Sequence, residues 1–299
     1  MIVADWRDAD AEVLRSCYDR EELHWQRQLG WETEQTWSTV EEARVTWGLP
    51  GLLALDGARV DGWAFFTRDD DMLQVGGLVS ESGEATAGIL DEVLKAATTA
   101  ALPIVSCFLL DRATGLRAEL TRRGFAIEPF LYLAAPLSVL ARRAGRADPA
   151  AGESWRDGDD DLAGDLLHAA YSPHAARHFA PHGTVAEWQH YTANMIEQTA
   201  CGVFDPQATR VVRQQCTLRA LALMTTIGPR TAHLAQMVVH PNEQGKGLAA
   251  QLLIEAATIA AAGGREEMTL LVSESNQPAR RLYERLGFTP RANFIAARR

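Results

Sequence analysis

The sequence predicts an α/β protein of two tandem domains, each with a mixed, mostly antiparallel sheet flanked by helices. Its length of 299 residues exceeds the usual size of a single domain. Two stretches also repeat one order of strand-like and helix-like patterns, and both close on Gly-Phe, at Gly124 and, 163 positions later, at Gly287. A repeat in order and spacing indicates an internal duplication.

In each copy we expect helices first and then an antiparallel meander. After the meander, strands and helices alternate, and the copy ends on a strand. Short β-branched and aromatic runs predict the strands, and apolar residues at helical spacing predict the helices. The first copy has strands at 62–66 and 73–79, a helix at 86–97, a strand at 104–110 and the helix of LRAELTRRGF. The second has strands at 218–227 and 233–239, a helix at 247–262, a strand at 268–272 and the helix of ARRLYERLGF.

The segment between the copies, LARRAGRADPAAGESWRDGDDD, carries glycines, a proline and a run of charges without an apolar period. Such a composition is typical of a linker. We therefore expect a first domain at 1–140, a linker at 141–153 and a second domain at 154–299.

Composition places the chain among globular proteins, with 47% hydrophobic and 23% charged residues. The net charge of −10 disfavours nucleic acid and anionic membranes as partners. No run of about 18 apolar residues predicts a membrane span, and no export signal is visible, so we expect a cytoplasmic protein. We also expect it to be a monomer or homodimer. The cysteines lack metal or disulfide spacing, and Cys107 and Cys216 are expected to be buried in strands.

Metal binding is not expected. His174, His178 and His182 lie four residues apart, which would stack them on one helix face. Pro173 and Pro181 interrupt such a helix. A solvated loop or a contact with the substrate remains open for this segment.

The loop QGKGLAA, residues 244–250, separates a strand from a helix and admits three interpretations. Gly245, Gly247 and Ala250 fit the dinucleotide fingerprint, but five residues intervene after the strand and an antiparallel meander precedes it. A Walker motif would need a serine or threonine after Lys246. A plain helix cap needs only one glycine or polar residue, and not a run of Gln-Gly-Lys-Gly. Glycines at the start of a helix, where amides point outward, suit a pyrophosphate.

Two motifs resemble the GNAT superfamily of N-acyltransferases. VVHPNEQGKGLAAQLL is similar to its acyl-CoA motif, in which Gln or Arg is followed by two residues, Gly, one residue, and Gly or Ala; Gln244, Gly247 and Ala249 fill it. NQPARRLYERLGF resembles the closing segment of the family, with Asn276 and Tyr283 seven residues apart. Together the motifs cover most of residues 205–299.

The resemblance implies acetyl-CoA as cosubstrate, no metal, and transfer to a primary amine of a small molecule. It implies a strand at 237–239 that splays from its neighbour to hold the pantetheine arm, and Tyr283 as the acid that protonates the leaving thiolate. Because Leu282 and Leu286 form the apolar stripe, Tyr283 is expected to point away from the core. The expected binding residues are Met237, Val238, Val239, Gln244, Gly245, Lys246, Gly247, Leu248, Ala249, Ala250, Asn276, Ala279 and Arg280.

The general base is not settled, with His233, His240 and Glu274 as candidates. A noncatalytic protein that binds or senses acyl-CoA is the alternative function.

The first copy departs from the motifs. Ala113 and Leu120 stand where the second copy has Asn276 and Tyr283, and two acids occupy its loop at 80–86. Acids beside a phosphate site would repel the ligand, so we expect this copy neither to bind acyl-CoA well nor to catalyse. The tryptophans of its first half are expected to serve packing.

Overall fold

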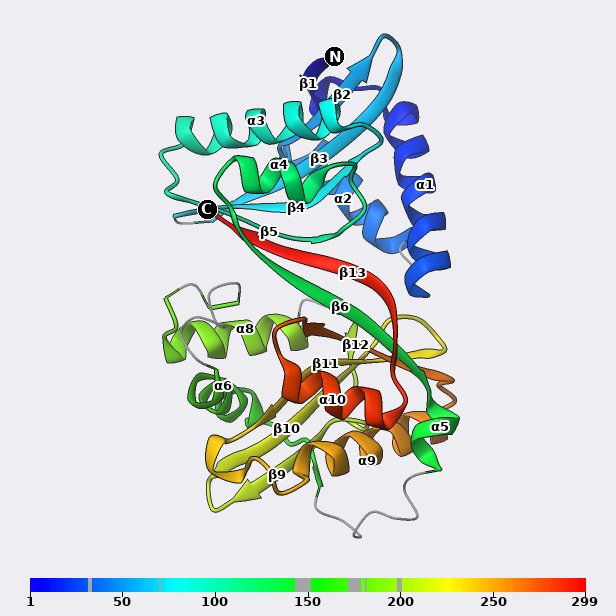
Figure 1. The fold of residues 1–299 in the computed structure, drawn as a ribbon, viewed down its shortest axis with the longest axis vertical. Coiled ribbons are helices and arrows are strands. Elements are labelled where there is room, and N and C mark those ends of the chain that lie inside the picture. The colour runs from blue at the N-terminus through cyan, green and yellow to red at the C-terminus, as the bar shows by residue number, and fades with distance from the viewer. Residues whose placement is uncertain (32–33, 70, 143–151, 172–178, 181, 198–200) are drawn as a thin grey trace. The chain divides into compact units, whose positions relative to one another are not determined.

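The computed structural model describes residues 1–31, 34–69, 71–142, 152–171, 179–180, 182–197 and 201–299 (Figure 1). They divide into two compact units. The first comprises Met1–Leu131, Ser273–Ser275 and Ala292–Arg299, and the second comprises Tyr132–Val272 and Asn276–Arg291. Most of the predicted linker, residues 143–151, lies outside the described residues, so the domain boundary at 141–153 stays a prediction.

The first unit holds a mixed sheet in the order β1-β2-β3-β4-β5-β13. Strands β1 to β4 pair antiparallel, β4 and β5 run parallel, and β13 returns antiparallel beside β5 with Phe294 opposite Leu110. The elements are β1 Ile2–Asp5, η1 Trp6–Asp8, α1 Ala11–Leu29, α2 Glu34–Trp47, β2 Gly51–Asp56, β3 Arg59–Asp69, β4 Met72–Ser80, α3 Gly83–Thr99, β5 Ile104–Leu110, α4 Leu116–Arg122, β6 Ala126–Pro136 and β13 Thr289–Arg298. Of these, β6 begins in the first unit and ends in the second, and β13 does the reverse.

Tryptophans fill the core between α1, α2 and the sheet of the first unit. Trp6 and Trp63 are buried and stack with ring centroids 6.3 Å apart, and Trp37 meets Trp63 edge-on at 5.6 Å. Large aromatic rings contribute most of the apolar area that such a small core can bury. Trp47 is the exception, because it ends α2 with its side chain exposed.

The second unit holds a mixed sheet in the order β12-β11-β10-β9-β7, with β8 also paired to β10. β11 and β12 run parallel, and the other pairs are antiparallel. The elements are α5 Leu137–Ala141, β7 Glu153–Ser154, α6 Asp159–Ala170, α8 Val185–Glu197, β8 Val203–Phe204, β9 Arg210–Gln214, β10 Thr217–Thr226, β11 Thr231–Val239, η3 Pro241–Glu243, α9 Leu248–Ala262, β12 Glu267–Ser273 and α10 Gln277–Leu286. The predicted α/β class, with a mostly antiparallel mixed sheet in each copy, is confirmed.

Both sheets share two irregularities at corresponding places. Gly76 in β4 and Ala235 in β11 are extra residues at a shift of register against the preceding strand, which is a β-bulge. The parallel pairing ends directly before each bulge residue, at Val75 in β4 and at Leu234 in β11. The ends of β4 and β11 therefore separate from the following strand in both copies.

One expectation about the cysteines is wrong. Cys216 is exposed, because it lies in the turn between β9 and β10 and not in a strand. Cys107 is buried in β5 as expected, and Cys17 is buried in α1.

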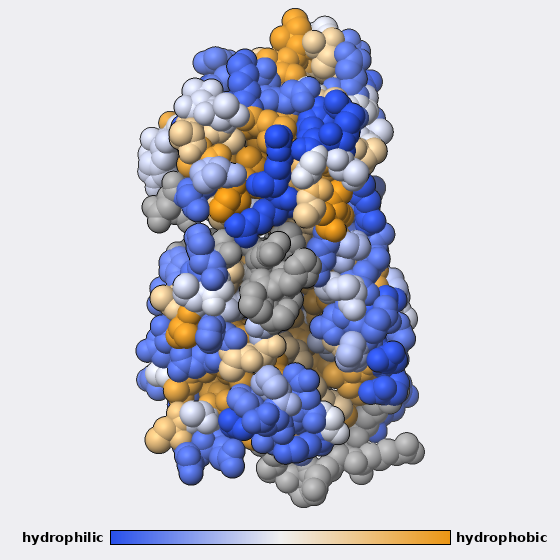
Figure 2. Space-filling view, turned by 60° about the vertical axis from the view of Figure 1, so that its left-hand side comes forward, coloured by the Kyte–Doolittle hydropathy of each residue, from blue (hydrophilic) through white to orange (hydrophobic). Residues whose placement is uncertain are grey.

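The surface is polar over most of the face drawn in Figure 2, and apolar residues reach it in separate places. Within the described part of the chain, every helix is too short or too polar to cross a membrane.

Candidate functional site

Among the described residues of the second unit, the end of β11 has an open backbone edge. Met237, Val238 and Val239 pair with β10 on one side, opposite Ala222, Leu221 and Ala220. On the other side the register with β12 stops at Leu234. Since alternate peptide groups of a strand point to each side, this leaves donors and acceptors that an extended molecule can pair with.

The loop after β11 requires its two glycines. Gly245 has a φ of +78° and Gly247 a φ of +84°, the left-handed region that other residues enter only with strain. Gly247 is the N-cap of α9, and no side chain caps this helix start. The first amides of α9, at Leu248, Ala249 and Ala250, thus lie at the positive end of the helix dipole without a side-chain acceptor among the described residues.

The polar side chains of this loop are already engaged with the protein. Gln244 Nε2 donates to the carbonyl oxygen of Val239 at 3.2 Å, and Lys246 Nζ donates to Glu243 Oε2 at 2.8 Å. Arg219 lies 3.5 Å from the other oxygen of Glu243. These cations, Lys246 first, lower the pKa of Glu243. Sequence reasoning missed Glu243, although an acid three residues before a loop lysine is a visible signal.

Asn276 lies at the start of α10 and caps this helix. Its Oδ1 accepts the amide of Ala279 at 3.2 Å, so it is the N-cap, with Pro278 in the first turn. Ala279 and Arg280 follow in that turn and are half-buried. The exposed amide group of Asn276 keeps its Nδ2 without a described acceptor, so binding of a pantetheine amide stays a prediction.

Tyr283 lies on the buried side of α10, which corrects the expectation that it points away from the core. Its relative exposure is 5%, equal to that of Leu286, whereas Leu282 is partly exposed. The ring meets Phe288 edge-on at 5.7 Å. Burial, and next the neighbouring Tyr171, raise the pKa of Tyr283, so its hydroxyl stays protonated.

A buried hydrogen-bond network connects the neighbourhood of Tyr283 with β11. Tyr171 donates to Gln236 Oε1 at 3.1 Å, and Gln236 Nε2 donates to the hydroxyl of Tyr191 at 2.9 Å. Gln236 directly precedes Met237, the first residue of the open edge. Sequence reasoning missed this network because its members come from three distant segments.

Residues 173–288 match the model of the acetyltransferase (GNAT) family. This span contains the open strand end, the uncapped helix start and Tyr283. The chain contains a GNAT domain.

Solved structures with the same fold cover most or all of the chain. A GCN5-related N-acetyltransferase from Sphaerobacter thermophilus has a TM-score of 0.66 at 16% identity, over 99% of this chain and 95% of that one. A tandem GNAT protein from the clavulanic acid biosynthesis pathway has a TM-score of 0.55 at 16% identity, over 84% and 82%. A GNAT-family acetyltransferase from Colwellia psychrerythraea has a TM-score of 0.54 at 12% identity, over 100% of this chain and 99% of that one. No curated protein sequence matches the chain.

The candidates for the general base of the GNAT domain lie in different surroundings. His233 is fully buried against Thr269, whose Oγ1 is 2.9 Å from Nδ1, and burial lowers its pKa to about 4. His240 Nδ1 accepts the amide of Asn242 at 3.3 Å at the start of η3. Glu274 belongs to the first unit. His233 sits where β11 is still paired with β12, so its neutral ring is a structural group; the base stays unassigned.

The histidine-rich segment is only partly described. His174 and His178 lie outside the described residues, whereas His182 Nδ1 lies 2.7 Å from Glu187 Oε1. Among the residues that can be described, no three His, Cys, Asp or Glu side chains gather as metal ligands would.

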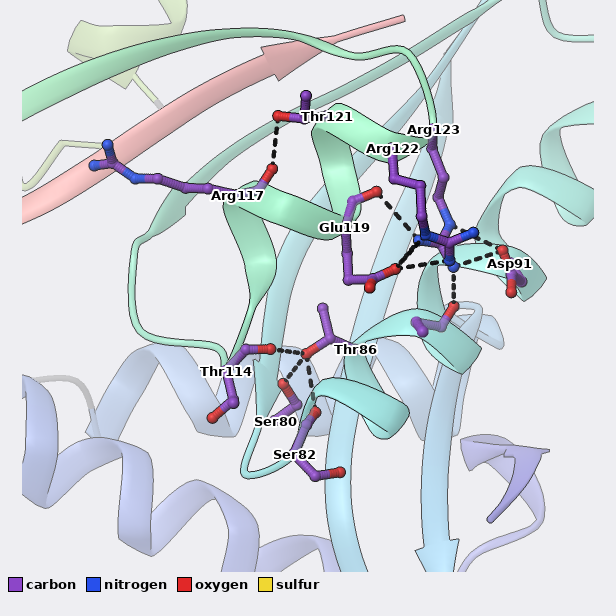
Figure 3. Close-up of polar contacts among 11 residues, drawn as sticks. Ser80, Ser82, Thr86, Asp91, Thr114, Arg117, Glu119, Thr121, Arg122 and Arg123 are labelled. Carbon is purple, nitrogen blue, oxygen red and sulfur yellow. Dashed lines mark hydrogen bonds and ion pairs between the residues drawn. The ribbon is translucent and has the colours of Figure 1, made fainter.

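The first copy fills the corresponding loop with its own side chains (Figure 3). Ser82 caps α3 by accepting the amide of Ala85 at 3.1 Å, and it donates to Asp61. Thr86 Oγ1 lies 2.7 Å from the carbonyl oxygen of Thr114. Nearby, Arg123 ties α4 to Asp91 at 2.8 Å. The capped helix start contrasts with the uncapped α9 of the GNAT domain.

The residues that replace the two motif side chains are apolar and buried. Ala113 is 6% exposed and Leu120 is 1% exposed. They pack into the core of the first unit. That this copy neither binds acyl-CoA nor catalyses remains a prediction, which the occupied loop supports.

Proposed function

We propose that the GNAT domain transfers the acetyl group of acetyl-CoA to a primary amine of a small molecule. The observation that carries the proposal is the helix start of α9, where two left-handed glycines precede amides that no described side chain caps. The same loop in the first copy is capped by Ser82. A helix start that follows glycines and lacks a side-chain cap has free backbone amides, which suit a pyrophosphate.

The binding residues follow from this geometry. The pyrophosphate contacts the amides of Gly245, Gly247, Leu248, Ala249 and Ala250, beside Gln244 and Lys246. The pantetheine arm pairs with the open edge of Met237, Val238 and Val239 as an added strand. The start of α10, with Asn276, Ala279 and Arg280, takes the remaining polar contacts of the arm.

Transfer occurs by direct attack. The amine nitrogen forms a bond to the thioester carbon, the carbon–sulfur bond breaks, and its electron pair leaves on sulfur. Tyr283 donates its hydroxyl proton to that sulfur and regains, through solvent, the proton that the attacking nitrogen loses as the amide forms. The acceptor must first lose a proton, which costs about 4.6 kcal/mol at pH 7 for an amine of pKa about 10.4.

A noncatalytic protein that binds acyl-CoA is the second candidate. The burial of Tyr283 favours it. The two candidates share the binding residues and differ only in whether amines release free CoA from acetyl-CoA.

The test measures acetyl-CoA binding by calorimetry and CoA release with a panel of amino acids, polyamines, aminoglycosides and amino sugars. Gln244→Glu with Gly247→Asp should abolish binding, whereas Gly264→Asp, at the other end of α9 with a φ of +86°, should retain it. Equal binding by both variants would remove the pyrophosphate assignment. Binding without CoA release by any amine would favour the noncatalytic candidate.

A further inference from the structure

A cavity of about 290 Å³ lies wholly within the first unit, between α1 and the ends of the strands. Arg20, Glu21, His24 and Arg27 line it from α1, and Arg112 lines it from the residues after β5. Its remaining wall is the start of β3 and the end of β4, where β4 has separated from β5. Its volume lies just below the roughly 300 to 1,000 Å³ of pockets for drug-sized ligands, which suits a single small metabolite.

The carboxylate of Glu21 is incompletely satisfied in the wall of this cavity. Its relative exposure is 3%, and its Oε1 accepts a hydrogen bond from Arg112. Oε2 is buried and has no hydrogen-bond partner among the described residues. A buried carboxylate oxygen without a donor is costly, so its presence points to a donor that a bound molecule supplies.

The rim of the cavity carries two cations that no described acid pairs with, although Arg20 donates to Cys17 Sγ at 3.5 Å. Arg20 and Arg27 lie two turns apart on α1 and are exposed, and no described carboxylate lies within ion-pair distance of either. The acids of the opposite wall do not compensate them, since Asp61 is bound by Arg59 and Ser82, and Glu81 lies 3.8 Å from Arg112. Among the described residues, the groups left unmatched are therefore two guanidinium groups at the rim, which lack an acid, and two buried atoms of the wall, Glu21 Oε2 and His24 Nε2, which lack a hydrogen bond.

We propose that this cavity binds a small dicarboxylic amino acid. The ammonium group donates to Glu21 Oε2, and the two carboxylates pair with Arg20 and Arg27, whose planar forks match that geometry. With Ala113 and Leu120 in place of the two motif side chains, the bound molecule is not acetylated there. The site is independent of the acetyl-CoA site proposed above.

The experiment titrates L-glutamate into the full chain by calorimetry, with and without saturating acetyl-CoA. Arg20→Gln with Arg27→Gln should weaken binding by at least about tenfold, as expected for loss of charge-assisted hydrogen bonds. Arg15→Gln, an exposed arginine of α1 that does not line the cavity, should leave the affinity unchanged. Acetyl-CoA should not displace L-glutamate.

Glutarate tests the contact with Glu21 without altering the protein. It carries the same two carboxylates but no amine, so it should bind at least about tenfold more weakly than L-glutamate. The proposal is overturned by an absence of heat with millimolar L-glutamate, by equal affinity in the double variant, by equal affinity for glutarate, or by displacement with acetyl-CoA.

Discussion

Lys246 Nζ lies 2.8 Å from Glu243 Oε2, so the lysine of the proposed pyrophosphate loop is held by an acid of the same segment. Glu243 also engages Arg219. A bound pyrophosphate must compete with this carboxylate for both cations. The pair is therefore expected to weaken acetyl-CoA binding.

Glu243→Gln should tighten acetyl-CoA binding by roughly two- to fivefold at low salt, the range that an exposed ion pair supports. Calorimetry at two salt concentrations measures this, and the gain should shrink at high salt. Glu266→Gln, which removes a similar exposed partner of Arg230, is the control and should change nothing. Weaker binding by Glu243→Gln would show that the carboxylate helps to hold the ligand.

Gly247→Ala should lose about 1 kcal/mol of unfolding free energy, because alanine resists a positive φ. It should also weaken acetyl-CoA binding, since the strained cap shifts the first amides of α9. Gly264→Ala, at φ +86° with open space around it, should show the same loss in urea denaturation and normal binding. Identical affinities in the two variants would contradict the role of the loop.

Tyr283→Phe should lower kcat by roughly a hundredfold, the contribution typical of a positioned general acid, while the Kd of acetyl-CoA stays within about twofold. Because burial raises the pKa of Tyr283, wild-type turnover should show no loss from its ionisation between pH 7 and about 10. Tyr18→Phe, which removes a buried hydroxyl of the first unit bonded to Glu41, is the control. Unchanged kcat in Tyr283→Phe would exclude the acid role.

His233 should make the protein sensitive to acid. The unfolded chain protonates this residue near pKa 6.5, whereas burial keeps the folded ring neutral down to about 4. Between these values the unfolded state binds more protons, so stability falls as the pH falls, by on the order of 3 kcal/mol. Urea denaturation from pH 7 to 4.5 should show a smaller loss in His233→Gln. Parallel curves for both proteins would contradict the prediction.

Ser82→Ala should cost about 1 kcal/mol of unfolding free energy, the usual value of a lost N-cap. Urea denaturation checks this, with Ser16→Ala as a control, since the Ser16 hydroxyl only bonds back to Glu12 on the exposed side of α1. Acetyl-CoA affinity should be normal in both variants. A second bound equivalent of acetyl-CoA in Ser82→Ala would show that the cap alone closes the first copy to the ligand.

The sequence predicts the locally coded parts of the fold closely. The strand at 104–110 has the observed bounds of β5, and the loop at 244–250 leads into α9 as expected, because apolar period and glycine punctuation are local signals. The turn at Cys216 is not predicted, since Gln215 takes a positive φ of 57° without any glycine or asparagine to announce it.

The sequence does not reveal which face of a helix is buried or which distant segments contact one another. The ten-residue α10 carries Leu282, Tyr283 and Leu286, and only packing decides that the tyrosine and not Leu282 is buried. The network of Tyr171, Gln236 and Tyr191 depends likewise on distant segments meeting. The repeat predicts a last strand at the end of the second copy but not that this strand pairs with β5.

The pairing of β13 with β5 sets an order on biosynthesis. Residues 1–131 leave the ribosome roughly ten to thirty seconds before residue 292, at ordinary rates of translation. Until then β5 exposes an edge on the side that β13 later occupies, in a segment as apolar as Ile104–Leu110. The nascent first unit therefore keeps an unpaired apolar strand edge until residues 292–298 are translated, although the residues that make up most of it are translated first.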